Sequence, residues 1–233
     1  MMDRSRYVAP STFERRFYQG AQRIVETWNR RYWLTTVHYE NPMPKPPYIL
    51  APTHRSNIDT LLVGSITRDP MTYMAKSGVF SHPVLAKLLR LLGGFPVDRD
   101  GTDRDAVEIA QAALLAGSSL VVFPEGTRRR GAMVEDLEEG AAYLALKAMV
   151  PIVPVGIAGS ERAMPVGATF VYPAPIAIEV GPALMPLSAR SSSLVGSRVR
   201  RSEITRLTLQ LMAELNRLRA QAEHERGRLR STL

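Results

Sequence analysis

Residues 48–60 read YILAPTHRSNIDT, a short apolar run followed by a polar cluster that opens a second apolar segment. A continuous apolar run of this length is typical of a buried strand, and Ser56 and Asn57 are typical residues at a helix start. We therefore expect a strand that ends in a loop at His54. A helix should begin near Asp59, with Ser56 or Asn57 as its N-cap.

His54 and Asp59 would lie far apart on a straight helix, because five residues turn a helix by about 500°. A bend between them lets Asp59 point back at one imidazole nitrogen. An aspartate there fixes the tautomer of the ring and stabilises its protonated form, so the other nitrogen can accept a proton near neutral pH. The pair predicts a general base, and the alternative is a surface histidine beside an acid.

The rest of the chain alternates apolar runs with amphipathic segments, which predicts a single α/β domain. We expect a mixed, mostly parallel sheet flanked by helices, with an N-terminal amphipathic helix. Strands are expected over residues 48–51, 71–75, 95–97, 119–123, 151–156, 170–172 and 176–180, the last at an edge of the sheet. Helices are expected over residues 11–35, 81–92, 103–116, 138–149 and 202–226, besides the one near Asp59.

Three regions are expected along the chain. Residues 1–46 should form the N-terminal helix and a proline-rich linker, and residues 47–187 the core. A Ser/Arg-rich connection and a C-terminal helix should cover residues 188–233. The C-terminal helix carries one apolar stripe, which predicts that it packs on the core.

The N-terminal helix combines aromatic anchors with arginines elsewhere around its axis. Its apolar residues recur at three- and four-residue spacing: Phe13, Phe17, Ala21, Ile24, Trp28 and Tyr32. Such a helix either lies in a lipid interface or packs its stripe on the core.

Charge and composition limit the classes of partner and the cellular location that we expect. The 233 residues carry a formal net charge of +8, which indicates an anionic partner: nucleic acid, an anionic membrane or a phosphorylated substrate. The absence of cysteine excludes disulfides and thiol catalysis and is compatible with a reducing cytoplasm. We expect neither a secretory signal nor a membrane span, which needs roughly 20 apolar residues. Arginine far outnumbers lysine, which favours a bacterial source with a GC-rich genome.

The loop after the predicted strand 119–123 reads EGTRRRG over residues 125–131. It combines glycines, a hydroxyl group and three guanidinium groups at the carboxyl end of that strand, where open α/β sheets bind ligands. Backbone N–H groups and arginine side chains together suit a phosphate. The alternative is that Arg129 and Arg130 belong to a solvated turn.

Four blocks in a fixed order resemble the lysophosphatidic acid/glycerol-3-phosphate acyltransferase family, the PlsC-like enzymes. They are THRSNID at 53–59, GFPVDR at 94–99, FPEGTR at 123–128 and VPIVPV at 150–155. The resemblance covers roughly residues 47–160. Thr53 stands where the family usually has asparagine.

The resemblance implies a fatty acyl transfer from coenzyme A or acyl carrier protein to the sn-2 hydroxyl of 1-acylglycerol 3-phosphate. It makes His54 the general base and Asp59 its orienting partner, with no metal or other cofactor. It assigns the substrate phosphate to Arg99, Glu125, Gly126, Thr127 and Arg128, with Lys76 as a further phosphate-binding residue. Glu125 could instead brace its loop. Stabilising the oxyanion would need N–H donors near the His54 loop or the adjoining helix start.

The expected partners are a lysophosphatidic acid or related lipid acceptor, an acyl thioester donor and a membrane surface, and not nucleic acid. The expected location is the cytoplasmic face of the cell membrane, as a peripheral or monotopic protein. Two alternatives remain open. The same chemistry could serve glycerol 3-phosphate or another lysophospholipid, or the chain could be a non-catalytic lipid binder at the membrane surface.

Overall fold

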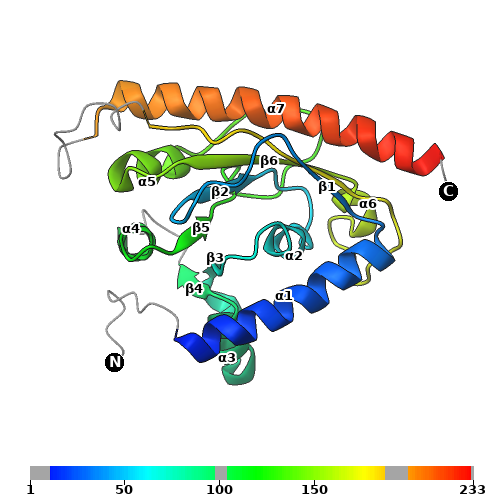
Figure 1. The fold of residues 1–233 in the computed structure, drawn as a ribbon, viewed down its shortest axis with the longest axis horizontal. Coiled ribbons are helices and arrows are strands. Elements are labelled where there is room, and N and C mark those ends of the chain that lie inside the picture. Colours follow the sequence, from blue (N-terminus) through cyan, green and yellow to red (C-terminus); the bar gives the residue numbers. More distant parts are fainter. Residues whose placement is uncertain (1–10, 98–103, 187–198, 232–233) are drawn as a thin grey trace.

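A computed structural model describes residues 11–97, 104–186 and 199–231 and shows a central seven-stranded sheet (Figure 1). The strands are β1 (Thr36–Tyr39), β2 (Ile49–Pro52), β3 (Met71–Lys76), β4 (Gly94–Val97), β5 (Ser119–Val121), β6 (Ile152–Ala158) and β7 (Ala177–Val180). Their order across the sheet is β1-β7-β6-β2-β5-β3-β4, and only the β6–β7 pair is antiparallel. The expected mixed, mostly parallel α/β fold is confirmed.

Helices cover both faces of the sheet. They are α1 (Thr12–Tyr32), α2 (Asp59–Gly64), α3 (Pro83–Leu91), α4 (Arg104–Leu115), α5 (Gly140–Ala148), α6 (Ser160–Ala163) and α7 (Arg201–Ser231), with a 3-10 turn at Ser77–Phe80. Figure 1 shows α5 and α7 on one side of the sheet and α1, α2 and α3 on the other. The arrangement is a three-layer sandwich around two apolar cores.

The two cores follow from the alternation of side chains along the central strands. On β2, Ile49 faces the core formed with α4, α5 and α7, whereas Leu50 faces the core formed with α1, α2 and α6. The expected apolar stripe of α7 is buried as predicted, at Ile204, Leu207, Leu211, Leu215 and Leu218. The C-terminal helix is therefore an integral part of the domain.

Four expectations about the elements were wrong. Residues 36–39, expected within the linker, form strand β1, whose four residues gain their order by pairing with β7. Strand β7 consequently lies between β1 and β6 and not at an edge. Residues 170–172 form no strand, because Phe170 and Tyr172 are both exposed and prolines follow. Helix α2 has Ile58 at its N-cap and no side-chain cap, because the Ser56 hydroxyl donates to the Met164 carbonyl oxygen and accepts only the N–H of Ile58 itself.

Helix α1 turns its polar side toward the protein. Gln22 donates to the carbonyl oxygens of Gly64 (2.7 Å) and Thr67, and Asn29 donates to the Ser65 hydroxyl at 3.0 Å. Most of the aromatic stripe points outward instead, with Phe13 71%, Ile24 73% and Trp28 52% exposed. Of the two alternatives for this stripe, packing on the core does not hold for most of it, because hydrogen bonds rather than apolar contacts hold much of the inner face.

Within residues 11–97, 104–186 and 199–231, no helix combines the length and apolar character needed to cross a bilayer.

Gly156 allows α7 to lie directly on β6. A Cβ at this position would sit 2.4 Å from the Leu218 carbonyl carbon and 2.5 Å from the Arg219 backbone nitrogen. Because both obstacles are backbone atoms of α7, a side chain here must displace the helix.

We expect Gly156→Ala to lower the free energy of unfolding by about 1–3 kcal/mol, the usual cost of overpacking, or more. Urea denaturation measures it. Gly227→Ala on α7 is the matched control, because nothing lies within 4 Å of its Cβ and a helical glycine is replaced by a better helix former. Equal effects of the two substitutions would contradict this account of the contact.

Candidate active site

The candidate site lies where the adjacent parallel strands β2 and β5 end. His54 is in the loop that follows β2, and Glu125 is in the loop that follows β5. The carboxyl ends of paired parallel strands meet at one edge of the sheet, which brings these loops together. Backbone hydrogen bonds join them, because the Arg129 N–H donates to the His54 carbonyl oxygen at 3.0 Å.

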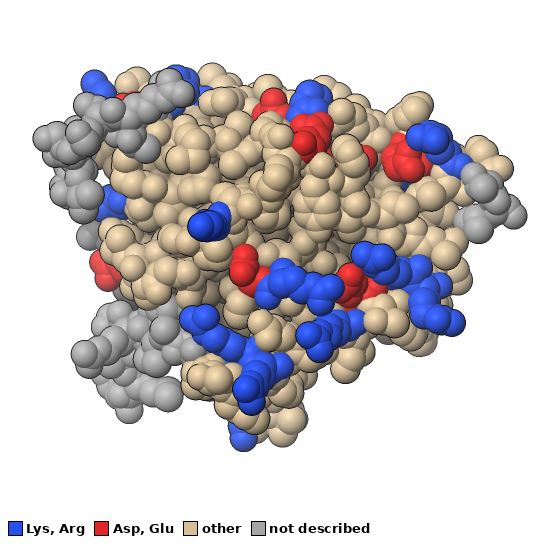
Figure 2. All heavy atoms as spheres, in the orientation of Figure 1, with Lys and Arg blue, Asp and Glu red and all other residues tan. Residues whose placement is uncertain are grey.

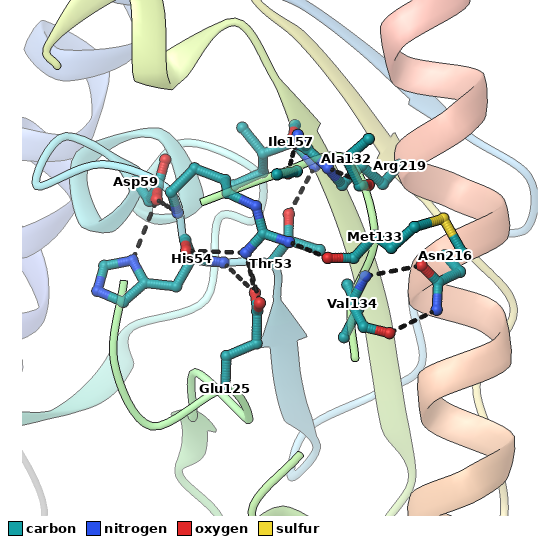
Figure 3. Close-up of polar contacts among 12 residues, drawn as sticks. Thr53, His54, Asp59, Glu125, Ala132, Met133, Val134, Ile157, Asn216 and Arg219 are labelled. Carbon is teal, nitrogen blue, oxygen red and sulfur yellow. Dashed lines mark hydrogen bonds and ion pairs between the residues drawn. The ribbon is translucent and has the colours of Figure 1, made fainter. Parts of the chain in front are cut away.

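His54 and Asp59 are in direct contact, as the predicted bend requires. The Nδ1 atom of His54 lies 3.0 Å from Oδ2 of Asp59 (Figure 3). The same oxygen accepts the backbone N–H groups of Arg55 and Ser56, each at 2.7 Å. Asp59 is fully buried, so one carboxylate oxygen fixes both the loop and the imidazole ring.

The second ring nitrogen of His54 is available for chemistry. A carboxylate only accepts hydrogen bonds, so Asp59 places the ring proton on Nδ1 and leaves the lone pair on Nε2. The His54 side chain is 15% exposed, and its ring lies 4.1 Å from the Phe123 ring, which supports one side. This geometry suits proton transfer with a bound molecule.

A buried ion pair supports the backbone of the His54 loop. Arg55 Nη1 donates to both carboxylate oxygens of Glu125, at 2.6 Å to Oε1, and both side chains are 1% exposed. Glu125 Oε1 also accepts the His54 backbone N–H at 2.8 Å. This is the bracing arrangement considered for Glu125, while a direct contact with a substrate phosphate stays a prediction.

Arg55 has a structural role that was not predicted from the sequence. Its Nη1 also donates to the His54 carbonyl oxygen at 3.0 Å, and Nη2 donates to the Met133 carbonyl oxygen at 3.2 Å. A charged residue inside the first sequence block, next to the proposed base, was the available signal. A single sequence cannot tell whether such an arginine faces a substrate or an internal carboxylate.

Helix α7 holds the far end of the β5 loop, which the sequence analysis also missed. Arg219 donates to the carbonyl oxygens of Ala132 (2.8 Å), Gly131 (3.0 Å) and Ile157 (3.0 Å). Asn216 accepts the Val134 N–H at 2.8 Å and donates to the Val134 carbonyl oxygen at 2.9 Å (Figure 3). The signal was an arginine four residues after Leu215, beside the buried stripe of α7.

Thr53, which departs from the usual asparagine, is buried and bonded to the neighbouring strand. Its hydroxyl oxygen accepts the Ile157 N–H at 3.0 Å, and its own N–H donates to the Val155 carbonyl oxygen at 2.9 Å. Thr53 therefore fastens the end of β2 to β6 and points away from the His54 ring nitrogen that is free to react.

Several backbone donors near His54 are already engaged. The N–H groups of Arg55 and Ser56 bond to Asp59, and that of His54 bonds to Glu125. These three groups cannot also stabilise an oxyanion without releasing those carboxylates. N–H donors for an oxyanion must therefore come from residues after Ser56 or from neighbouring loops.

The predicted phosphate-binding residues are only partly placed. Gly126, Thr127 and Arg128 are exposed on the loop after β5, and Gly126 has a φ of +66°, a conformation that favours glycine. Lys76 ends β3, and its side chain lies outside the described part of the chain. Arg99 also lies outside the described residues. The described segments contain no cluster of three or more His, Cys, Asp or Glu residues suited to a metal ion.

Known proteins resemble this chain in sequence and in fold. A family model described as Acyltransferase matches residues 34–158, more than half of the chain. The probable 1-acyl-sn-glycerol-3-phosphate acyltransferase of Mycoplasma genitalium is 30% identical over 151 residues, covering 61% of this chain and 56% of that protein. The 1-acyl-sn-glycerol-3-phosphate acyltransferase of Streptococcus pneumoniae is 31% identical over 128 residues, covering 52% and 47%. The chain thus spans about half the length of these relatives.

A solved structure has the same fold. The crystal structure of the 1-acyl-sn-glycerophosphate (LPA) acyltransferase PlsC from Thermotoga maritima aligns with a TM-score of 0.66 and 21% identity. The alignment covers 88% of this chain and 80% of that one. With the family model spanning the His54 and Glu125 loops, the chain belongs to the acyltransferase family.

Proposed function

We propose that this protein transfers a fatty acyl group from an acyl thioester to the sn-2 hydroxyl of 1-acylglycerol 3-phosphate, giving phosphatidic acid. The observation that carries the proposal is the 3.0 Å contact between His54 Nδ1 and the buried Asp59 carboxylate. It sits within the segment matched by the acyltransferase family model. The similar proteins named above are 1-acyl-sn-glycerol-3-phosphate acyltransferases.

In this proposal His54 acts as the general base. Its Nε2 takes the proton of the acceptor hydroxyl while the hydroxyl oxygen attacks the thioester carbonyl carbon. The tetrahedral oxyanion then collapses, the carbon–sulfur bond breaks, and the thiolate takes the proton back from His54. Asp59 stabilises the imidazolium that exists between the two transfers. The chain contains no cysteine that could carry the acyl group, which agrees with a direct transfer.

An acceptor panel tests the substrate. Thiol release from palmitoyl-coenzyme A should be faster with lysophosphatidate than with glycerol 3-phosphate or a lysophospholipid with a larger headgroup. Robust turnover of another acceptor beside none of lysophosphatidate would contradict the proposed substrate and keep the chemistry.

We further propose that α1 and α3 bring the enzyme to a membrane surface. The outward stripe of α1 lies beside α3, whose Val84, Leu85 and Leu88 are 71%, 42% and 43% exposed. Figure 2 shows Lys and Arg side chains gathered over this part of the molecule. Those exposed in the two helices are Arg15, Arg16, Arg23, Arg30, Arg31, Lys87 and Arg90. Apolar side chains among basic ones suit an anionic lipid interface, from which a lipid acceptor can be drawn.

We expect the double substitution Ile24→Asn/Trp28→Ala to weaken binding to vesicles of phosphatidylcholine and phosphatidylglycerol by about tenfold or more, because each side chain loses its burial in lipid. Vesicle co-sedimentation measures it. The free energy of unfolding should hardly change, because both side chains are exposed. Leu209→Asn on α7, 56% exposed on the other side of the sheet, is the control and should leave binding unchanged. An equal loss with both variants would contradict the assignment of the surface.

A further inference from the structure

A second site lies beside the His54 loop, in a pocket of about 280 Å³ lined mainly by arginines. Its wall is formed by the β5 loop, by α6 and the turn after it, and by α7. The charged side chains that line it are Arg55, Arg129, Arg130, Glu161 and Arg219. Arg55 is already paired with Glu125, so three further guanidinium groups face one carboxylate, and this excess of positive charge suits an anion.

The buried arginines of the pocket have unused capacity to bind an anion. Arg55 is 2% exposed and its Nε has no hydrogen-bond partner within the described residues. Arg219 is 8% exposed and donates only to backbone carbonyl oxygens among the described contacts. Burial lowers the pKa of the Arg219 guanidinium from its ordinary value and the nearby charge of Arg55 lowers it further, while the Glu161, Glu223 and Glu125 carboxylates act in the opposite direction. A bound anion would offset this repulsion.

The two exposed arginines complete the site. Arg129 and Arg130 form no ion pair with any described residue, and both line the pocket. Guanidinium groups bind phosphate oxygens in pairs, and about 280 Å³ accommodates a phosphate or diphosphate group rather than a whole coenzyme. The one acidic wall residue, Glu161, has a buried Oε2 without a partner in the described segments.

Of the predicted acceptor-phosphate residues, Lys76 lies on the other side of His54 from this pocket, whereas Gly126, Thr127 and Arg128 precede Arg129 in the same loop. In the strand order β6-β2-β5-β3-β4, His54 follows the central β2. The pocket includes Glu161, Pro165 and Val166, which follow β6 on one side, whereas Lys76 ends β3 on the other side, beside β4. An acyl thioester bound at His54 carries its phosphates on the far side of its thiol arm from the reacting carbonyl. A donor phosphate in the pocket would therefore leave the Lys76 side of His54 open to the acceptor.

We propose that this pocket binds a phosphate group of the acyl donor, a chemistry that coenzyme A and the phosphopantetheine arm of acyl carrier protein share. The proposal rests on the acyl-thioester donor of the proposed function. It assigns donor binding to Arg129 and Arg130, with Arg55 and Arg219 as the fixed inner wall.

The test is the affinity for coenzyme A itself, measured by isothermal titration calorimetry without acceptor or turnover. We expect Arg129→Gln/Arg130→Gln to weaken it by about tenfold or more, because two charge-assisted contacts are lost. The KM for palmitoyl-coenzyme A should rise by a similar factor while the KM for lysophosphatidate stays unchanged. The fold should persist, because Arg129 contacts His54 through its backbone N–H.

Two controls distinguish the loss of positive charge in general from the loss of charge at the pocket. Arg200→Gln/Arg201→Gln removes the same charge at the opposite end of α7, where these residues pair with Glu203 and Glu139, and should leave affinity unchanged. A phosphate-free donor, palmitoyl-N-acetylcysteamine, should react equally well with wild type and with the Arg129/Arg130 variant.

Titration with 4′-phosphopantetheine distinguishes the two possible sources of the bound phosphate. A loss of affinity there places the shared pantetheine phosphate in the pocket, and a loss only with intact coenzyme A places its nucleotide phosphates there.

Unchanged coenzyme A affinity in the Arg129/Arg130 variant would overturn the proposal. It would favour the alternative that these two arginines belong to a solvated turn. A rise in the KM for lysophosphatidate alone would overturn it in favour of an acceptor site. If wild type binds coenzyme A through these arginines but never acylates lysophosphatidate, the acceptor is refuted and the pocket assignment stands.

Discussion

His54→Ala is expected to reduce kcat/KM for acyl transfer by about 10²–10⁴-fold, the range that general acid–base catalysis contributes. Substitution removes Nε2, the proton acceptor in the proposed reaction, and the 3.0 Å partner of Asp59. The overall fold should remain, because the carboxylate of Asp59 still accepts the N–H groups of Arg55 and Ser56. Thiol release with palmitoyl-coenzyme A and lysophosphatidate measures the effect, with circular dichroism as the check on folding.

The control for this substitution is His224→Ala on α7, an exposed histidine that lines a separate pocket with β1, three strands from β2. It should retain wild-type activity. Asp59→Asn should reduce activity less severely than loss of the ring, because the imidazole remains but its tautomer is no longer fixed. Activity of His54→Ala within a few-fold of wild type would refute the general-base role.

Glu125→Ala is expected to lower the free energy of unfolding by about 3–5 kcal/mol, because it leaves the buried Arg55 charge without its carboxylate partner. The Arg55 and Glu125 side chains are both 1% exposed, so water cannot replace the lost partner at low cost. Activity should fall as well, since the His54 N–H also depends on Glu125. Urea denaturation followed by circular dichroism measures the stability.

A paired substitution separates loss of charge balance from loss of packing. Arg55→Met/Glu125→Leu should recover part of the stability lost in Glu125→Ala, because replacing both members of a buried ion pair by apolar residues is often neutral. Glu135→Ala, at an exposed position in the same loop, is the control and should change stability by no more than about 0.5 kcal/mol. Equal destabilisation by Glu125→Ala and Glu135→Ala would show that the ion pair does not brace the loop.

The central part of the fold could be predicted because its signals are local. The apolar runs of β2 and β6 and the stripe of α7 each follow a short periodicity that a single sequence reveals. The contact of His54 with Asp59 followed from five-residue spacing and the need for a bend. Strand β1 could not be predicted in the same way, since its four residues are ordered by β7, about 140 positions later.

Roles that depend on distant partners were equally hidden. Glu125 looks like part of a phosphate loop in sequence, but its carboxylate meets Arg55, 70 residues earlier. The direction of the α1 stripe was undecided because its aromatic face and its polar face are both plausible inner faces. In the structure, Gln22 and Asn29 form hydrogen bonds to α2 and to the residue after it, and these bonds hold the polar face inward.

The most direct test of the proposed activity is mass spectrometric detection of phosphatidic acid from palmitoyl-coenzyme A or palmitoyl-acyl carrier protein and 1-acylglycerol 3-phosphate, with His54→Ala as the comparison. We predict a product acylated at the sn-2 position with wild type, and at least a hundredfold less with folded His54→Ala, in keeping with general-base catalysis. The absence of product from folded wild type with both donors, beside vesicle binding through α1, would contradict the activity and favour a non-catalytic lipid binder.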